Sequence, residues 1–301
     1  MTLVGRFAPS PTGTLHLGNL RTALASWLSA RSKGGRWIIR MEDVDGPRCR
    51  REHGERQLRD LAALGLERDA PVLWQSARGE AYRAALEALH ASGRLYPCAC
   101  TRKDLAVLAS APHAGDGLRA YPGRCRDRAW EGFDRALRVK LPDGEVAWED
   151  LLLGAQVDIP AQLTGDPLLF RRDGLFAYHL AVVVDDCAQG VTEVVRGADL
   201  RSVTATQIRL QEALGLPRPV YAHPGLVTAP DGSRLGKREG ALGLEELQAK
   251  GVTVPEIVGW LGWSLGCLER PEACAAKELV PRFGWDRVPR VPVKVPMVWS
   301  D

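Results

Sequence analysis

The sequence lacks any apolar run of the roughly 18 residues that a membrane-spanning helix requires. Its first residues, MTLVGRFAPSP, contain no apolar stretch of the kind found in a secretory signal. It also contains no internal repeat and no low-complexity segment. These absences argue against membrane-embedded and secreted proteins. We therefore expect a cytoplasmic, monomeric protein without a membrane partner.

Cysteine is too sparse and too scattered for a disulfide-stapled fold. The chain has 7 cysteines, an odd number, and only three of them cluster. Small secreted scaffolds instead carry dense, even sets of cysteines. We expect reduced cysteines, of which four, isolated in the sequence, are simply packed: Cys49, Cys187, Cys267 and Cys274.

A strong excess of one charge is also missing. The 40 Lys and Arg residues nearly balance 37 Asp and Glu residues, which leaves a formal net charge of +3. Net charge therefore neither indicates nor excludes a nucleic-acid partner, and any basic surface has to be local.

A chain of 301 residues is long enough for about two domains. Its first part alternates between strand and helix patterns, which favours an α/β fold with a parallel sheet. The expected elements are a strand at Val4–Phe7, a helix from about Gly18, a strand at Trp37–Met41, and helices at 52–64 and 78–92.

The pattern changes at Pro97. Segment 98–130 has weak periodicity and reads as a small, separately stabilised unit. Further on we expect strands at 136–140, 176–184, 191–195 and 221–227, helices at 202–214, 244–247 and 254–261, and a Pro-rich surface tail over the last 21 residues. The resulting division is 1–97 and 176–243 as two halves of one domain, 98–175 as an insert, and 244–301 as a short helical segment with a tail.

The strongest local signal is the loop FAPSPTGTLHLGN between the first strand and the first helix. The N-terminus of that helix is suited to phosphate because its free N–H groups and its dipole favour anions. Gly13 and Gly18 would let the backbone approach a ligand, and His16 would donate a hydrogen bond to a phosphate. A histidine taken alone at this position favours a solvent-facing cap, and the composite loop reverses that preference.

This loop resembles the first signature of class I aminoacyl-tRNA synthetases, in which His16-Leu17-Gly18-Asn19 takes the place of the HIGH motif. The stretch Arg6-Phe7-Ala8-Pro9-Ser10-Pro11-Thr12-Gly13 is similar to the glutamyl-tRNA synthetase group. The resemblance implies a Rossmann-like catalytic domain, an ATP site that includes His16 and Gly18, and catalytic roles for His16 and Asn19. Asn19 replaces a His, a variation that this group allows.

A second signature, Ser233-Arg234-Leu235-Gly236-Lys237-Arg238, resembles the KMSKS loop of the same class. The resemblance implies that Lys237, together with Arg238, binds ATP, and that Lys237 stabilises charge on its phosphates, with Mg²⁺ as counter-ion. A solvated basic loop is the alternative for these two residues alone. Gly236 departs from the usual Ser.

Glutamate carries two carboxylates and one ammonium group, so its site needs cations and one buried anion. Arg6 and Arg196 lie on strands whose carboxyl ends we expect to meet, and Glu42 ends the second strand. Two arginines favour glutamate over glutamine, whose amide would leave one cation unpaired. Taken one at a time, an arginine of this kind is typical of a surface ion pair, a glutamate of a solvated turn and a tyrosine of the core. The resemblance assigns glutamate binding to Arg6, Phe7, Ala8, Pro9, Ser10, Glu42, Tyr178 and Arg196.

Cys98-x-Cys100, followed after 24 residues by Cys125, is consistent with a structural zinc site. Buried or free thiols are the alternative. Such a site wants a fourth ligand, and His113, Tyr121 or a distant group are the candidates. Spacing alone favours His113.

The chain leaves little room for an anticodon-binding region. Only 63 residues follow Arg238, fewer than a helical anticodon-binding domain needs. This feature, together with Tyr121-x-x-x-Cys125 after Cys98-x-Cys100, resembles the glutamyl-Q tRNA(Asp) synthetase group and points to Tyr121 as the fourth zinc ligand.

That resemblance implies activation of L-glutamate with ATP and its transfer to the queuosine base in the anticodon stem-loop of tRNA(Asp). A phenolate ligand would need the zinc ion to lower its pKa from about 10. Arginines 119, 124, 126 and 128 would contact the RNA backbone or form a solvated loop. A truncated glutamyl-tRNA synthetase charging tRNA(Glu), or a silent tRNA- or nucleotide-binding paralogue, are the alternatives.

Overall fold

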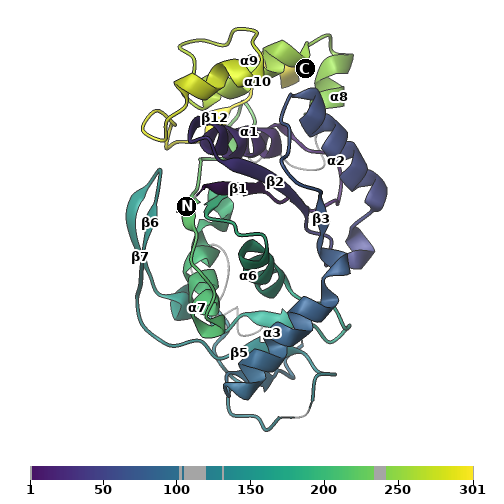
Figure 1. Cartoon of the computed structure of the whole chain (residues 1–301), viewed down its shortest axis with the longest axis vertical. Helices are drawn as coiled ribbons and strands as arrows, with labels where there is room; N and C mark the ends of the chain where they lie inside the picture. The colour runs from purple at the N-terminus through teal and green to yellow at the C-terminus, as the bar shows by residue number, and fades with distance from the viewer. Residues whose placement is uncertain (1, 102–103, 105–119, 131, 234–241, 301) are drawn as a thin grey trace.

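The computed structural model describes residues 2–101, 104, 120–130, 132–233 and 242–300. A seven-stranded sheet in the order β3-β2-β1-β9-β10-β6-β7 forms its centre (Figure 1). Pairing is parallel from β3 to β6, and only β7 runs antiparallel to its neighbour. This confirms the expected α/β fold. The strands are β1 Val4–Phe7, β2 Arg36–Met41, β3 Leu73–Trp74, β6 Val146–Asp150, β7 Gly154–Asp158, β9 Glu193–Val195 and β10 Val220–Ala222.

The strand order reverses direction between β1 and β9. From β1 the chain proceeds outward through β2 to β3 on one side, and through β9 to β10 on the other. Connections on the two sides therefore leave a crevice at the carboxyl ends of β1 and β9, where Phe7 and Val195 end their strands. Ligands of open parallel sheets bind at such a switch point.

Helices cover both faces of this sheet (Figure 1). Helix α1 packs on one face, where its buried side includes Leu20, Leu24 and Leu28 at helical spacing. Helices α6 and α7 lie on the other face, with α3 beyond them. The bounds are α1 Leu17–Ser32, α2 Arg51–Ala63, α3 Gly79–Ala91, α6 Tyr178–Ala188 and α7 Thr204–Leu214, with short 3₁₀ turns at Gly46–Arg48, Gln75–Ala77 and Ala198–Val203.

A second, three-stranded antiparallel sheet carries the cysteine-containing part of the chain. It consists of β4 Leu95–Pro97, β5 Leu137–Val139 and β8 Leu168–Phe170. The short helix α5, Pro160–Leu163, precedes β8. The hairpin of β6 and β7 lies within 98–175 in sequence, yet it extends the main sheet rather than this smaller one.

The strand expected at 176–184 is wrong, because this segment begins helix α6. The run Leu180–Val184 is rich in Val and shows no polar interruption, which is typical of a buried strand. Here the helix is buried on several sides, so its inner positions are also continuous: Leu180, Ala181, Val182 and Val183 are all buried.

The expected strand at 221–227 is two strands, β10 and β11 Val227–Thr228, joined by a loop. The Pro-rich tail is not merely a surface segment. Its strand β12, Val293–Lys294, pairs in parallel with β11, and Val288 and Val295 join the main core. The C-terminal helices are α8 Leu244–Ala249, α9 Val254–Ser264, α10 Ala276–Leu279 and α11 Met297–Ser300, with a 3₁₀ turn at Val280–Arg282.

Among the described residues, no helix is both long enough and apolar enough to cross a membrane.

Candidate active site

A cavity of about 800 Å³ opens at the switch point between β1 and β9. Its lining includes every residue that the resemblance assigned to glutamate binding, and these residues come from four separate parts of the chain. Three further residues, from the first loop and helix, also line it. These residues are Arg6, Phe7, Ala8, Pro9, Ser10, Glu42, Tyr178 and Arg196, with His16, Gly18 and Asn19.

Two of its lining residues are buried arginines. Arg6, on β1, donates through Nη1 to the carbonyl of Val195 at 2.9 Å, and its Nε lies 3.6 Å from Oδ1 of Asp186. Burial lowers the pKa of Arg6, against the opposing effect of Asp186. The contact with Val195 also ties β1 to β9 at the point where the cavity opens.

Glu42 belongs to a buried charge network with Arg6, Arg40 and Asp186. The sequence predicted a site role for Arg6 but not for Arg40 or Asp186. Arg40 donates to Oε1 of Glu42 at 3.3 Å and to Oδ1 of Asp186 at 2.7 Å. Burial raises the pKa of Glu42, although Arg40 and Arg6 act in the opposite direction. The available signal was the charged pattern itself: Arg40 interrupts an apolar strand, and Asp186 follows a run of valines. Buried charges of this kind require partners.

Arg196 directly follows β9, and side chains from three parts of the chain hold it. Its Nη1 donates to Oε1 of Gln207 at 2.6 Å and lies 3.4 Å from the hydroxyl of Tyr178. Its Nη2 donates to Oγ1 of Thr204 at 2.9 Å, and its Nε faces Nε2 of His223 at 3.1 Å. Of these partners, the sequence predicted only Tyr178. Thr204, Gln207 and His223 contact Arg196 only because α7 and the chain after β10 pack beside it.

His16 is the N-cap of α1. Its Nδ1 accepts a hydrogen bond from the backbone N–H of Gly18 at 3.1 Å, which places the ring proton of a neutral His16 on Nε2. A Cβ on Gly18 would lie 3.0 Å from the His16 ring, so the glycine lets the ring fold over the helix end. Asn19 accepts from the backbone N–H of His16 at 3.2 Å and completes a capping box.

The structure describes both sides of the KMSKS-like segment, but residues 234–241, and with them Gly236, Lys237 and Arg238, lie outside the described residues. Before the segment, Val227 lines the cavity. After it, the carbonyl of Leu242 accepts from the backbone N–H of Leu17 at 2.9 Å, beside the first turn of α1.

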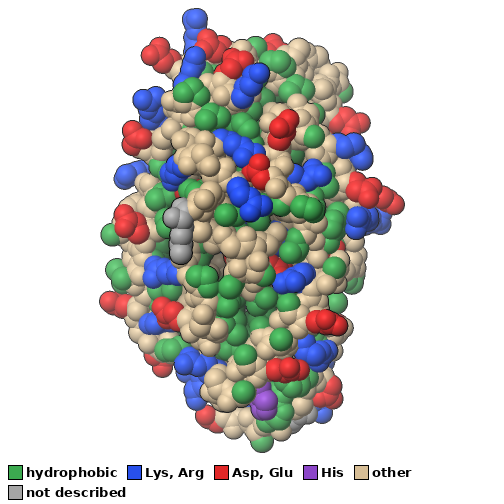
Figure 2. Space-filling view, in the orientation of Figure 1, with side chains coloured by type: hydrophobic (Ala, Val, Ile, Leu, Met, Phe, Trp, Pro, Cys, Tyr) green, Lys and Arg blue, Asp and Glu red, His purple; other side chains and the backbone are tan. Residues whose placement is uncertain are grey.

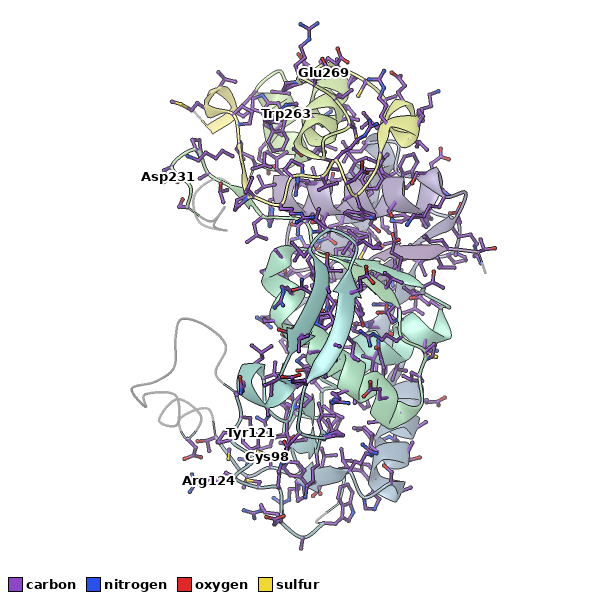
Figure 3. The ribbon with its side chains drawn as sticks, turned by 90° about the vertical axis from the view of Figure 1, so that its left-hand side faces the viewer. Cys98, Tyr121, Arg124, Asp231, Trp263 and Glu269 are labelled. Atoms are coloured by element: carbon purple, nitrogen blue, oxygen red, sulfur yellow. The ribbon has the colours of Figure 1, made fainter. Side chains whose placement is uncertain are left out.

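The three clustered cysteines lie together, and none of them lines the cavity; Figure 3 labels Cys98 and Tyr121 near the end of the molecule opposite Trp263 and Glu269. The sulfur atoms of Cys98, Cys100 and Cys125 are all within 4.8 Å of one another. The hydroxyl of Tyr121 is 3.7 Å from the Cys98 sulfur and 3.9 Å from the Cys100 sulfur. A tetrahedral zinc ion with Zn–S bonds of about 2.3 Å sets its ligand atoms about 3.8 Å apart, so this donor set fits the ion.

Arg138 packs against this cluster. Its guanidinium lies 3.8 Å above the Tyr121 ring, and its Nε donates to the Cys98 sulfur at 3.4 Å. Burial raises the pKa of Tyr121, which favours the neutral phenol unless a cation binds its oxygen. His113, the ligand favoured by spacing alone, lies outside the described residues.

The arginines proposed for RNA contact differ in their surroundings. Arg126 is committed to a buried carboxylate: its Nε and Nη2 bind Asp166 at 2.5 and 2.8 Å. Arg124 is exposed and labelled in Figure 3, whereas Arg119 lies outside the described residues. Over the face drawn in Figure 2, basic and acidic side chains are interspersed. On this face, any charge that binds RNA is therefore local.

Comparisons with known proteins agree with this geometry. The chain matches the family "tRNA synthetases class I (E and Q), catalytic domain" over residues 2–290. A glutamyl-Q tRNA(Asp) synthetase of Symbiobacterium thermophilum is 46% identical over 313 residues, which cover 98% of this chain and 96% of the relative. One of Geobacter sulfurreducens is 52% identical over 244 residues, which cover 80% of this chain and 77% of the relative.

Solved structures share the fold. A glutamate-tRNA synthetase of Elizabethkingia anophelis superposes with a TM-score of 0.84 at 24% identity, covering 100% of this chain and 69% of that one. A glutamate tRNA ligase of Elizabethkingia meningosepticum in complex with its amino acid gives the same TM-score and identity, with 68% of that chain covered.

Proposed function

The chain belongs to the class I tRNA synthetase family (E and Q), and within it we propose that it activates L-glutamate with ATP and transfers it to the queuosine base of tRNA(Asp). It is thus a ligase-type enzyme. The glutamate half of the proposal is supported by one observation above all, the convergence of Arg6, Arg196 and Glu42 on a single cavity.

The charges of this cavity complement those of glutamate. Arginine forks bind carboxylates, and two arginines, Arg6 and Arg196, are available for two carboxylates. Glu42 would receive the ammonium group, whose positive charge would also favour the ionised form of this buried carboxylate. Ala8, Ser10 and Tyr178 would shape the rest of the glutamate site.

Activation is a displacement at phosphorus. An oxygen of the glutamate α-carboxylate attacks the α-phosphate of ATP, and the bond to the β-phosphate oxygen breaks, which yields glutamyl-adenylate and pyrophosphate. The first turn of α1, with His16 and Gly18, would position the phosphates, and Lys237 would stabilise the charge that develops on them. Mg²⁺ accompanies ATP as its counter-ion.

Transfer completes the reaction. A hydroxyl of the queuosine base attacks the activated carbonyl, and AMP leaves with the bonding electrons. The names of relatives that cover 98% and 80% of this chain support tRNA(Asp) as the acceptor. Arg124 remains a candidate for contact with the RNA backbone. A monomeric, cytoplasmic protein is part of the same proposal.

A structural zinc ion belongs to the proposal as well. Cys98, Cys100, Cys125 and Tyr121 would hold it, and it would supply cross-linking rather than reactivity, because none of these residues lines the cavity. The protein would contribute to zinc binding a set of ligand atoms that already lie close together, with Arg138 beside them.

The test has two stages. Glutamate-dependent exchange of pyrophosphate into ATP is measured with and without tRNA, with glutamine and aspartate as control amino acids. Labelled glutamate is then offered with queuosine-containing tRNA(Asp), unmodified tRNA(Asp) and tRNA(Glu). The proposal expects exchange with glutamate and transfer to the queuosine-containing tRNA(Asp) alone. Charging of tRNA(Glu) would contradict it in favour of a truncated glutamyl-tRNA synthetase, and absence of exchange under every condition would indicate a silent paralogue.

A further inference from the structure

We propose that Asp150 and His223 are positioning residues for Arg196: Asp150 fixes the tautomer of His223 whose proton is on Nδ1, so that Nε2 accepts from Arg196. The effect on glutamate rests on the proposed function above. The protonation pattern follows from the contacts alone.

Asp150 determines whether Nδ1 of His223 carries a proton. Oδ2 of Asp150 lies 2.6 Å from Nδ1 of His223, and both side chains are 0% exposed. Oδ1 accepts from the backbone N–H groups of Leu152 and Leu153 at 2.9 and 3.0 Å. Although burial opposes it, these hydrogen bonds hold the pKa of Asp150 below its ordinary value. An ionised carboxylate only accepts hydrogen bonds, so Nδ1 of His223 must donate.

Arg196 determines whether Nε2 of His223 carries a proton. Its Nε carries a hydrogen at any accessible pH and lies 3.1 Å from Nε2 of His223, so this nitrogen must accept. A doubly protonated imidazole would set N–H against N–H. Burial and the charge of Arg196 lower the pKa of His223 to about 4, although the hydrogen bond with Asp150 acts in the opposite direction. At neutral pH His223 therefore holds a single proton, on Nδ1.

The surrounding side chains fix the plane of the ring. The Tyr221 ring is stacked on His223 with an interplanar angle of 10°, and the Trp148 ring meets it at 74°. His223 is not among the residues that line the cavity, so it acts through Arg196 rather than on a ligand. Because Nε of Arg196 is anchored to His223, the guanidinium plane is set before a carboxylate arrives, which lowers the entropic cost of binding.

Asp150→Asn separates positioning from simple packing. The amide has the same shape, but its oxygen must keep facing the two backbone N–H groups, since those groups only donate. Its NH₂ group then faces Nδ1 of His223, which has to accept, and the proton moves to Nε2. That proton can be donated to Oγ1 of Thr204, 3.2 Å away, but Nε of Arg196 loses its acceptor.

Three variants make the test. Asp150→Asn is expected to weaken glutamate binding, measured by calorimetry, by about 10-fold and to leave ATP binding within about twofold. His223→Gln can still accept from Arg196 and donate to Asp150, so its glutamate affinity should remain within about threefold. Glu149→Gln is the matched control, because this carboxylate is exposed on the same strand, one position before Asp150.

Nitrogen-15 NMR of the histidine side chains reads the tautomer directly. The unmodified protein should show one histidine protonated on Nδ1, a signal that is absent from His223→Gln and changes to the Nε2-protonated form in Asp150→Asn. An unchanged tautomer in Asp150→Asn, or glutamate affinity within twofold of the parent protein, would overturn the proposal. If the parent protein binds no glutamate, the proposed function fails, while the NMR result still decides the tautomer.

Discussion

Arg21 and Ser264, which lie 243 positions apart in sequence, are joined by two hydrogen bonds. Nε of Arg21 donates to the Ser264 hydroxyl at 3.0 Å and Nη2 to its carbonyl at 2.8 Å. A third bond, 2.7 Å long, runs from Nη1 to the carbonyl of Gly225, a residue that lines the cavity. One buried side chain thus links α1, the end of α9 and the loop after β10.

Arg21→Ala should therefore destabilise the chain. The change leaves the buried carbonyl of Ser264 and the half-buried carbonyl of Gly225 without this donor and creates a void, at a cost of about 3 kcal/mol in the free energy of unfolding. Urea unfolding followed by circular dichroism measures it. Arg36→Ala removes an exposed arginine of β2 and should stay within about 0.5 kcal/mol of the parent protein. Equal losses for both variants would contradict the linking role of Arg21.

Glu42→Gln should raise the KM for glutamate by about 10-fold or more, with the KM for ATP unchanged. A neutral amide cannot match an ammonium group, and it also removes a charge from the network with Arg40. Pyrophosphate exchange with varied glutamate and ATP separates the two constants. The control is Glu52→Gln, an exposed carboxylate on α2. An equal rise in both KM values would point to general disruption of the fold.

Lys237→Ala should lower kcat for adenylate formation by about 100-fold and change the KM for glutamate little, because the lysine is assigned to charge that develops on the phosphates. Single-turnover formation of adenylate measures this step. Lys277→Ala, at an exposed position of α10, is the control. Normal exchange by Lys237→Ala would refute the role given to this lysine.

The cysteine cluster predicts one zinc ion per chain. Metal analysis of protein purified without chelator should find it, and Cys98→Ser should lose it, whereas Cys187→Ser on α6 should retain it. Arg138→Met should weaken zinc binding by about 10-fold in a chelator competition, because its guanidinium balances the negative charge of the thiolates. Zinc-free protein with full stability would remove the site from consideration.

Stability should depend on pH through His223. Its pKa is about 4 in the folded chain against an ordinary 6.5, so between these values the unfolded chain binds the extra proton. The free energy of unfolding should thus fall as pH drops, by about 2 kcal/mol from pH 7 to pH 5 for this group. His179, whose pKa is also lowered to about 4 by burial, adds a similar dependence. Comparing the parent protein with His223→Gln isolates the first contribution, and identical pH profiles would contradict it.

Local patterns were sufficient for much of the fold and for three charged residues of the cavity, whereas the resemblance to a known family supplied the others, including Tyr178. The first strand, loop and helix have clear signals in a short stretch, and Arg6 and Arg196 stand at strand ends that a parallel sheet must bring together. The approximate positions of α2, α3 and α9 also followed from helical spacing. Helices α2 and α3 each have one buried face, which a periodic sequence reveals, whereas α9 is buried on several sides.

Other parts depend on contacts that no short stretch records. Helix α6 is buried on several sides, so its sequence carries no helical stripe. Asp150 and His223 are 73 positions apart and meet only because β6 pairs with β10. The tail residue Val293 pairs with Val227 across the sequence in the same way. Such relationships are set by tertiary packing, which overrides local propensity.

The central position of β1 has a consequence for synthesis on the ribosome. Its two edges pair with β2 and with β9, whose paired residue opposite Gly5 is Glu193. At about 5–20 residues per second, β1 and β2 would emerge about 10–30 s before β9 is made. During that interval one edge of β1 stays open, and an open edge is a template for pairing with other chains. A nascent chain paused in this window should be a preferred client of ribosome-associated chaperones.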